Sequence, residues 1–346
     1  MDMNKSTDIL EEFQDKIDRT AFGELPISDY NKRYIANLKS SMGYYLTIYT
    51  YVWRHARSIA PVKYEDIVLV DYGGGCGFFS ILMKKFGIGK VVYVDHNPDS
   101  VQTVKVLGEV FGTGPDAVIS GGSEDLVAWC HKNEVRPNLI VGLDVIEHIY
   151  DLKRFFADLF MLNKNGLSLI FTTGSNPSNY WKCRKLRKEM DAYEKGKAAT
   201  PNYYTKRLEF IRQNYPEMEE KEAREYATQT RGMNYKDIQY FIHSNDWQGT
   251  GATTPTGFRD AHNTCDPETG NYMERILPIQ EYYGCMPDRE NCRIALKCGF
   301  YNNCTNRWLK RQCASILNWL IARTGNFGFR LAPFIFITAV WKGVEK

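Results

Sequence analysis

The residues best suited to ligand chemistry form a glycine-rich run directly after the apolar stretch 67–70. Its acidic start and alternating glycines are Asp71, Gly73, Gly75 and Gly77. Glycines let the backbone turn tightly and approach a ligand, and the helix expected from Phe78 offers unpaired N–H groups to an anion. A dinucleotide fingerprint would need a further glycine at Phe78 or Ser80, so the spacing argues against a pyrophosphate ligand.

Acidic residues follow the next two apolar runs. Asp95 stands 24 residues after Asp71, where a carboxylate can accept hydrogen bonds from both hydroxyls of a ribose. His96 comes next in the chain, and Glu124 and Asp125 follow the third run, where they suit an adenine edge. We therefore expect a nucleoside-containing ligand, bound by these residues together with the glycine run and Asp144.

Candidate catalytic groups occur in two places. Asp144, Glu147 and His148 stand at i, i+3 and i+4, a spacing that brings all three to one side of a helical turn. His262 lies in the polar loop 259–267, which we expect, with its neighbours Trp247, Phe258 and Tyr272, to recognise an acceptor; a structural cluster of Asn and Asp turns is the alternative. Because either histidine can take a proton from a hydroxyl, His148, His262 and Asp144 are the predicted catalytic residues.

The elements that must position these residues lie mainly in residues 66–174. Short apolar runs alternate there with helical segments, which predicts a parallel sheet covered on both faces, with ligands at the carboxyl ends of its strands. Residues 1–65 predict an N-terminal helical cap. Between residues 30 and 60 its apolar side chains recur every three or four positions and should pack over another part of the protein.

The second half of the chain changes character. Residues 175–280 are polar and charged and are expected to be an insertion or lid that binds the acceptor, with helices over 180–195 and 205–228. Residues 281–346 are expected to return to the core. Their predicted elements are helices over 288–298 and 307–323 and a strand over 333–341. We expect the helix over 307–323 to pack onto the sheet rather than lie on a membrane surface.

Composition limits the possible partners and location. The chain has 346 residues, with 44 basic and 41 acidic side chains, and this balance argues against nucleic-acid binding. Nine cysteines without paired spacing favour a reducing compartment over a disulfide framework, and the polar N-terminus does not resemble a signal peptide. The apolar stretches are shorter than the ~20 residues of a membrane-spanning helix. A cytoplasmic protein is expected, with peripheral membrane contact the less favoured possibility.

The residues quoted above resemble the class I S-adenosylmethionine-dependent methyltransferases. The similarity rests on the D-x-G-x-G-x-G run, on Asp95, and on the segments 123–125, 143–149 and 162–174, where Asn165-Gly166 replaces the family's Gly-Gly. It implies a seven-stranded Rossmann-like α/β sheet, mostly parallel, with an antiparallel last strand over 334–341 and the preceding strand after Gly299. It also implies S-adenosylmethionine as cofactor, with the glycine run near its methionine part, Asp95 at the ribose, and Glu124 or Asp125 at the adenine amine.

The same resemblance leaves the metal question open. Some ubiquinone-biosynthesis and small-RNA O-methyltransferases carry a similar acidic-x-x-Glu-His pattern that holds a divalent metal, whereas in many relatives the Glu-His pair orders the loop beside the cofactor. We expect no metal at Asp144, Glu147 and His148. The separations of Cys285, Cys292, Cys298 and Cys304 likewise lack the Cys-x-x-Cys spacing of a structural zinc site.

The expected function is methyl transfer from S-adenosylmethionine, with an oxygen of a small molecule or glycan as the preferred acceptor. Two alternatives stay open: a nicotinamide-dependent oxidoreductase, and a binding module that keeps the cofactor fold without catalysis. The absence of a third glycine at the dinucleotide spacing counts against the oxidoreductase. The acidic residues Asp71 and Asp95 count against the non-catalytic binding module.

Overall fold

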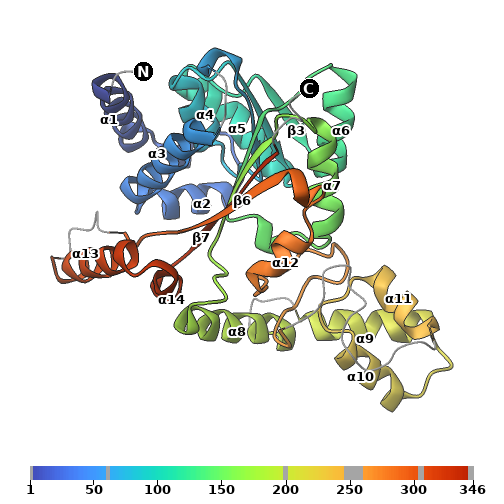
Figure 1. Ribbon diagram of the computed structural model, residues 1–346. Coiled ribbons are helices and arrows are strands. Elements are labelled where there is room, and N and C mark those ends of the chain that lie inside the picture. Colours follow the sequence, from blue (N-terminus) through green and yellow to red (C-terminus); the bar gives the residue numbers. More distant parts are fainter. Residues whose placement is uncertain (1–2, 60–62, 198–201, 245–259, 303–307, 342–346) are drawn as a thin grey trace.

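The computed structural model describes residues 3–59, 63–197, 202–244, 260–302 and 308–341. Its centre is a seven-stranded sheet of order β3-β2-β1-β4-β5-β7-β6 (Figure 1). The strands are β1 Val68–Tyr72, β2 Lys90–Asp95, β3 Ala117–Ser120, β4 Leu139–Leu143, β5 Ser168–Thr173, β6 Cys292–Cys298 and β7 Ile335–Trp341. Strands β1 to β5 are parallel, and β7 runs antiparallel to β5 and β6. The predicted fold class is confirmed.

Helices cover both faces of this sheet because its central strands are apolar on both sides. Leu69 of β1 packs in one core with helices α4 and α5, whereas Val70 packs in another with α6 and α7. The second pair of helices lies opposite the first in Figure 1. Their bounds are α4 Phe78–Lys85, α5 Pro98–Phe111, α6 Ser123–Lys132 and α7 Leu152–Leu162.

The N-terminal segment forms three helices that pack on the α4–α5 side, as its apolar spacing predicted. They are α1 Met3–Arg19, α2 Asp29–Lys39 and α3 Met42–Ile59, with 3-10 turns at Phe22–Glu24 and Tyr64–Asp66. Helix α3 contacts α4 through aromatic rings, for example Tyr49 and Phe79, whose centroids lie 5.3 Å apart. This packing carries α2 and α3 over the carboxyl ends of the first strands.

The region after β5 contains more helices than predicted. Helix α8, Tyr180–Lys195, has the predicted bounds, but the single helix expected over 205–228 is wrong. Two helices occur instead, α9 Tyr203–Asn214 and α10 Glu220–Gln229, followed by α11 Tyr235–His243. Pro216 explains the break, because a proline disfavours the helical conformation of the residue before it. The three helices share a small apolar core and stand apart from the sheet in Figure 1.

Two predictions for the last part of the chain are also wrong. Residues 288–298 form the 3-10 turn Arg289–Asn291 and strand β6 rather than a helix, so the sixth strand precedes Gly299 instead of following it. Its apolar residues Ile294 and Leu296 alternate with Arg293 and Lys297, which is the period of two typical of a strand. Arg293 and Lys297 are also four positions apart, a spacing that suggested one face of a helix.

Helix α13, Trp308–Arg323, has the expected extent, but most of its apolar side chains do not pack onto the sheet. It contacts the short helix α14, Gly328–Leu331, and leaves Trp308, Leu309, Ile316 and Trp319 exposed. The remaining helix is α12, Ile279–Gly284, which adds Tyr282 to the core on the α6–α7 side. Within the described residues, no helix is long and apolar enough to span a membrane.

The glycine at the start of α4 gives a prediction about stability. Gly77 has φ +89°, and a Cβ there would lie 2.2 Å from Val104 Cγ2, whereas Gly87, with φ +83°, has nothing within 4 Å of such a Cβ. Gly87→Ala should lower the free energy of unfolding by about 1 kcal/mol through backbone strain alone. Gly77→Ala should lower it by about 2–4 kcal/mol, because overpacking adds to the strain.

Urea unfolding of the two variants checks this prediction. Equal losses of stability in both would show that contact with Val104 does not constrain the glycine run.

Candidate active site

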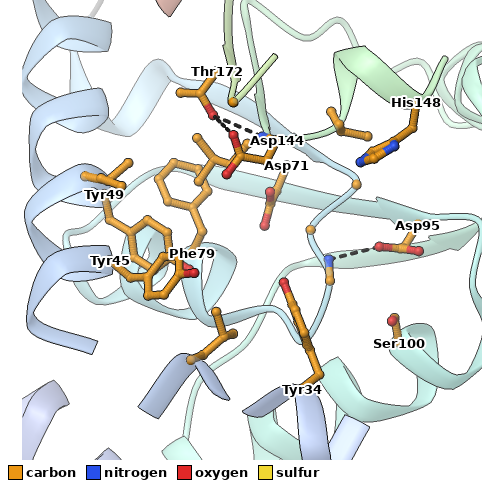
Figure 2. Close-up of a pocket in the computed structure, with 18 of the residues that line it drawn as sticks. Tyr34, Tyr45, Tyr49, Asp71, Phe79, Asp95, Ser100, Asp144, His148 and Thr172 are labelled. Atoms are coloured by element: carbon orange, nitrogen blue, oxygen red, sulfur yellow. Dashed lines mark hydrogen bonds between the residues drawn. The ribbon is translucent and has the colours of Figure 1, made fainter. Parts of the chain in front are cut away.

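A cavity of about 610 Å³ lies at the carboxyl ends of β1, β2 and β4, where the sequence predicted a ligand. Its floor is the glycine run, its polar walls come from the ends of β2, β4 and β5, and α2 and α3 close it with aromatic rings (Figure 2). Cavities of this size hold small ligands. The arrangement thus brings most of the predicted cofactor residues into one enclosure.

Asp95 ties the end of β2 to the glycine run. Its Oδ2 accepts a hydrogen bond from the backbone N–H of Gly75 at 2.9 Å (Figure 2), and its Oδ1 accepts one from the N–H of Asn97 at 2.8 Å. The Tyr93 hydroxyl donates to the Gly75 carbonyl at 2.5 Å. Since a carboxylate oxygen can accept more than one hydrogen bond, Asp95 orders the loop and still has lone pairs for a ligand.

The glycine run needs its glycines for a structural reason. Gly73, Gly75 and Gly77 have φ angles of +67°, +55° and +89°, in the left-handed region that glycine adopts readily. Gly73 and Gly75 line the cavity with Gly74, whereas Gly77 caps the start of α4 and does not. The exposed backbone of the first three residues thus forms part of the cavity wall.

Asp71 lies beneath the run with 1% of its surface exposed, and its Oδ2 accepts a hydrogen bond from the Ser80 hydroxyl at 2.6 Å. Burial raises the pKa of this carboxyl to about 7, against the lowering effect of Ser80. Asp71 reaches the cavity as part of its lining. A partly protonated carboxyl at this position can both accept and donate a hydrogen bond near neutral pH.

The residues predicted for the adenine end are divided by the structure. His96 lines the cavity beside Asn97 and Ser100. Glu124 and Asp125 are not among the described residues that line it: Glu124 pairs with Arg154, and Asp125 accepts a hydrogen bond from the Gly122 N–H at 2.9 Å, capping α6. These two contacts supply a structural use for both carboxylates.

Asp144 stands at the end of β4 with a positive φ of +51°, which is uncommon for a residue other than glycine. The Thr172 hydroxyl receives a hydrogen bond from the Asp144 N–H at 3.0 Å and donates one to Asp144 Oδ1 at 3.3 Å (Figure 2). The carboxyl lines the cavity. Although Asp144 is exposed to the cavity, its enclosure by surrounding protein atoms and the nearby carboxylate of Glu274 raise its pKa, whereas Thr172 and Lys182 oppose that rise.

His148 also lines the cavity, and its Nδ1 lies 2.9 Å from the backbone carbonyl of Tyr272. Glu147, by contrast, is buried and lies outside the described lining. Asp144 precedes the 3-10 turn Ile146–His148, so the helical spacing expected for the three residues does not apply to it. The predicted group is therefore divided, with Asp144 and His148 at the cavity and Glu147 behind it.

The other predicted catalytic histidine is not brought to this cavity. His262 Nδ1 lies 3.0 Å from Asp191 Oδ1, and its backbone carbonyl accepts a hydrogen bond from Arg231. It is absent from the described residues that line the cavity. Tyr272 is buried against Tyr150, while Trp247, Phe258 and Arg259 of the predicted recognition segment, like Cys304, lie outside the described residues.

The aromatic wall of the cavity was not predicted from the sequence. The hydroxyl of Tyr34 would lie 3.2 Å from a Cβ at Gly75, and Figure 2 shows it pointing toward the glycine run. Tyr45, Tyr49 and Phe79 form the side of the same cavity. The helical spacing of the tyrosines was visible in the sequence, but it indicates only a buried face and not which surface that face covers.

The family profile described as "Methyltransferase domain" matches residues 45–218, half of the chain. No curated protein matches this chain. Among solved structures, the chain is similar to the plantazolicin methyltransferase BamL in complex with a triazolic desmethylPZN analog and SAH. The two are 12% identical, the match covers 97% of this chain and 98% of that chain, and the TM-score is 0.41.

Two other matches are shorter. The PH0226 protein from Pyrococcus horikoshii is 17% identical over 36% of this chain, with a TM-score of 0.26. A precorrin-6y C5,15-methyltransferase from Geobacter metallireducens is 12% identical over 36% of this chain, also with a TM-score of 0.26. The match spans only 53% and 62% of the length of these two proteins. By its family match, the chain belongs to the methyltransferase-domain family, as the resemblance to class I S-adenosylmethionine-dependent methyltransferases predicted.

Proposed function

We propose that this protein is an S-adenosylmethionine-dependent methyltransferase that methylates an oxygen of a small molecule or a sugar unit. One observation carries the proposal: a single cavity joins the glycine run and Asp95 to Asp144 and a wall of aromatic rings. A cofactor and an acceptor can therefore meet within it. Family membership argues against the nicotinamide-dependent alternative.

The glycine run fits a cofactor that needs close contact with backbone. A Cβ at Gly73 would lie 2.6 Å from Val145 Cγ2, and one at Gly74 would lie 2.6 Å from the Tyr93 ring, so side chains at these positions are excluded. Backbone groups of the run would hold the methionine part, and Asp95 would accept hydrogen bonds from the ribose. When bound, S-adenosylmethionine supplies a methyl group on a positively charged sulfur.

The rest of the adenosine would lie toward His96. Asn97 and Ser100 line that end of the cavity together with His96. Glu124 and Asp125 remain predictions for the adenine amine, although their present hydrogen bonds and ion pair serve α6 and its neighbour.

The acceptor side combines flat apolar surfaces with a few polar groups. Tyr45, Tyr49 and Phe334 line the cavity with Asp144 and Lys182. Aromatic faces suit the apolar face of a sugar or another ring, and a few convergent polar groups fix its orientation. Helices α2 and α3 also reduce access of water, which favours a compact acceptor over a long polymer.

Asp144 is the proposed proton acceptor for an acceptor hydroxyl. Its carboxyl faces the cavity, and its Oδ1 is held by Thr172. Its raised pKa makes it a stronger base than an ordinary carboxylate while it is ionised. His262, paired with Asp191 outside the described lining, takes no part in this proposal.

We also infer a cytoplasmic location from the eight described cysteines, all free thiols.

The cofactor pose predicts the effect of Asp95→Asn. Exchange of one carboxylate oxygen for an amide N–H should weaken S-adenosylhomocysteine binding by about 1–3 kcal/mol, or about 5- to 150-fold in Kd, because an acceptor for buried donors is lost. Isothermal titration calorimetry measures the change. Glu109→Gln on the exposed side of α5 is the matched control and should bind as the wild type does.

Circular dichroism and the melting temperature of each variant must first show that it folds. Wild-type affinity in folded Asp95→Asn would remove Asp95 from the cofactor site.

The role of Asp144 predicts a loss of turnover with little loss of cofactor affinity. The assay follows label transfer from labelled S-adenosylmethionine to fractionated cell extract. At saturating cofactor, transfer by Asp144→Asn should be about 10²–10⁴-fold slower than transfer by the wild type. In the wild type, transfer should fall as the pH drops through the raised pKa of Asp144, above the usual carboxyl range, because only the ionised form accepts a proton.

His262→Ala serves as the contrast and should keep the rate within about threefold. A drop as large as that of Asp144→Asn would restore the prediction made from the sequence. No label transfer by the wild type to any fraction would favour the non-catalytic binding module.

A further inference from the structure

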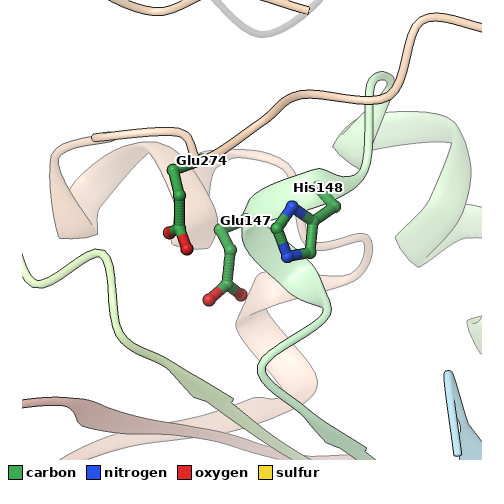
Figure 3. Close-up of side chains that lie close together, drawn as sticks. All are labelled: Glu147, His148 and Glu274. Carbon is green, nitrogen blue, oxygen red and sulfur yellow. The ribbon is translucent and has the colours of Figure 1, made fainter. Parts of the chain in front are cut away.

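We infer that Glu147, His148 and Glu274 form a binding site for one divalent cation of the class that accepts mixed carboxylate and imidazole ligands, such as Mn²⁺ or Zn²⁺. One ligand atom from each residue lies within 4.8 Å of those of the other two (Figure 3). The first two come from the 3-10 turn after β4 and the third from the chain before α12. This site goes beyond the proposed methyl transfer and does not depend on it.

The imidazole of His148 is prepared to act as a ligand. The Tyr272 carbonyl can only accept a hydrogen bond, so the nearby Nδ1 must donate the proton, and this leaves the lone pair on Nε2. A hydrogen bond from the second ring nitrogen to a carbonyl is how metal-binding histidines are commonly oriented. The Tyr272 N–H also donates to the His148 carbonyl at 3.1 Å, so the two segments hold each other in register.

Glu147 supplies an independent indication of a missing partner. It is 1% exposed, and its Oε1 accepts a hydrogen bond from the Gly174 N–H at 3.3 Å. Its Oε2 is buried without a hydrogen-bond partner among the described residues. A buried carboxylate oxygen without a partner is costly in free energy and rare in native proteins, and a cation would satisfy it.

Glu274 completes the ligand set. Its Oε2 accepts a hydrogen bond from the Ser175 hydroxyl at 2.6 Å, which fixes the carboxylate and leaves Oε1 available. Like His148 it is half-buried, so the cluster is not sealed. Two carboxylates and one imidazole give a mixed oxygen and nitrogen set, which suits Mn²⁺ or Zn²⁺ better than Ca²⁺.

The local charge also favours a cation. Burial raises the pKa of Glu147, and the nearby carboxyl groups of Asp144 and Glu274 raise it further, whereas Thr173 opposes the rise. Lys182 lowers the pKa of Asp144, but among the described residues neither Glu147 nor Glu274 has an ion pair within 4.0 Å. A shared proton is the competing way to relieve this repulsion, and the experiment separates the two.

A bound cation would lie beside the cavity, since His148 lines it. His148 Nε2 would then be a ligand rather than a base, in agreement with Asp144 as the proton acceptor. The site would also hold the 3-10 turn after β4 against the chain before α12, at the boundary between the sheet and the helical region.

The test uses the full chain after removal of metals with a chelator and without S-adenosylmethionine, so that failure of methyl transfer cannot affect it. Mn²⁺ is added, and the free ion is followed by electron paramagnetic resonance. We expect one ion per chain, displaced by Zn²⁺. Glu274→Gln should weaken Mn²⁺ binding at least tenfold, and Glu147→Gln should do the same.

Glu268→Gln, at an exposed carboxylate in the same part of the chain, is the matched control and should leave binding unchanged. If Glu147→Gln does not fold, Glu274→Gln at the half-buried position decides. Binding that the Glu274 variant leaves unchanged would identify an ion elsewhere on the surface and overturn the proposal. Absence of binding at millimolar Mn²⁺, with a higher melting temperature for Glu147→Gln, would show a shared proton instead.

Discussion

The hydrogen bond from the Gly75 N–H to the Asp95 carboxylate is the contact on which the cavity depends. It joins the glycine run after β1 to the end of β2, and the positive φ angles of the run place its backbone rather than side chains at the cavity. Asp71 lies beneath the same loop, bonded to Ser80 at the start of α4. Two buried acidic residues at neighbouring strand ends thus hold one loop, and this loop defines the proposed cofactor end of the cavity.

Segments outside the central strands complete this cavity. Helices α2 and α3 lay tyrosines over the glycine run, and the region after β5 adds Lys182 and Phe334 to the lining. The strand ends therefore supply the glycine run and the acidic residues, and the N-terminal helices and the region after β5 supply the aromatic rings and Lys182.

The fold and the meeting of the glycine run with Asp95 could be predicted because their signals are local. Alternating apolar runs mark strands buried on both faces, and the spacing of Asp71, the glycines and Asp95 follows directly from a strand, a turn and a helix. Strand β6 was missed because its seven residues carry Arg293 and Lys297 at a helical spacing, while its pairing with β7 involves residues far away in the chain. Short edge strands owe their conformation to such partners.

The proposed acceptor side could be predicted only in part for the same reason. His148 and Asp144 follow β4 directly, so their place at the sheet edge was expected. The approach of Glu274 to Glu147 joins residues more than a hundred positions apart, and nothing in either local sequence indicates it. His262 was chosen for its residue type in a polar loop, and only the structure reveals that Asp191 and Arg231 already use its polar groups.

The central claim is that an adenosyl sulfonium compound, rather than a dinucleotide, occupies the cavity above Asp71 and Asp95. A crystal structure of the protein grown with S-adenosylhomocysteine tests it most directly. We predict density for the ligand with its ribose hydroxyls at the Asp95 carboxylate and its methionine part against the glycine run. Density for the ligand elsewhere, or a phosphate group bound in this cavity in its place, would contradict the account.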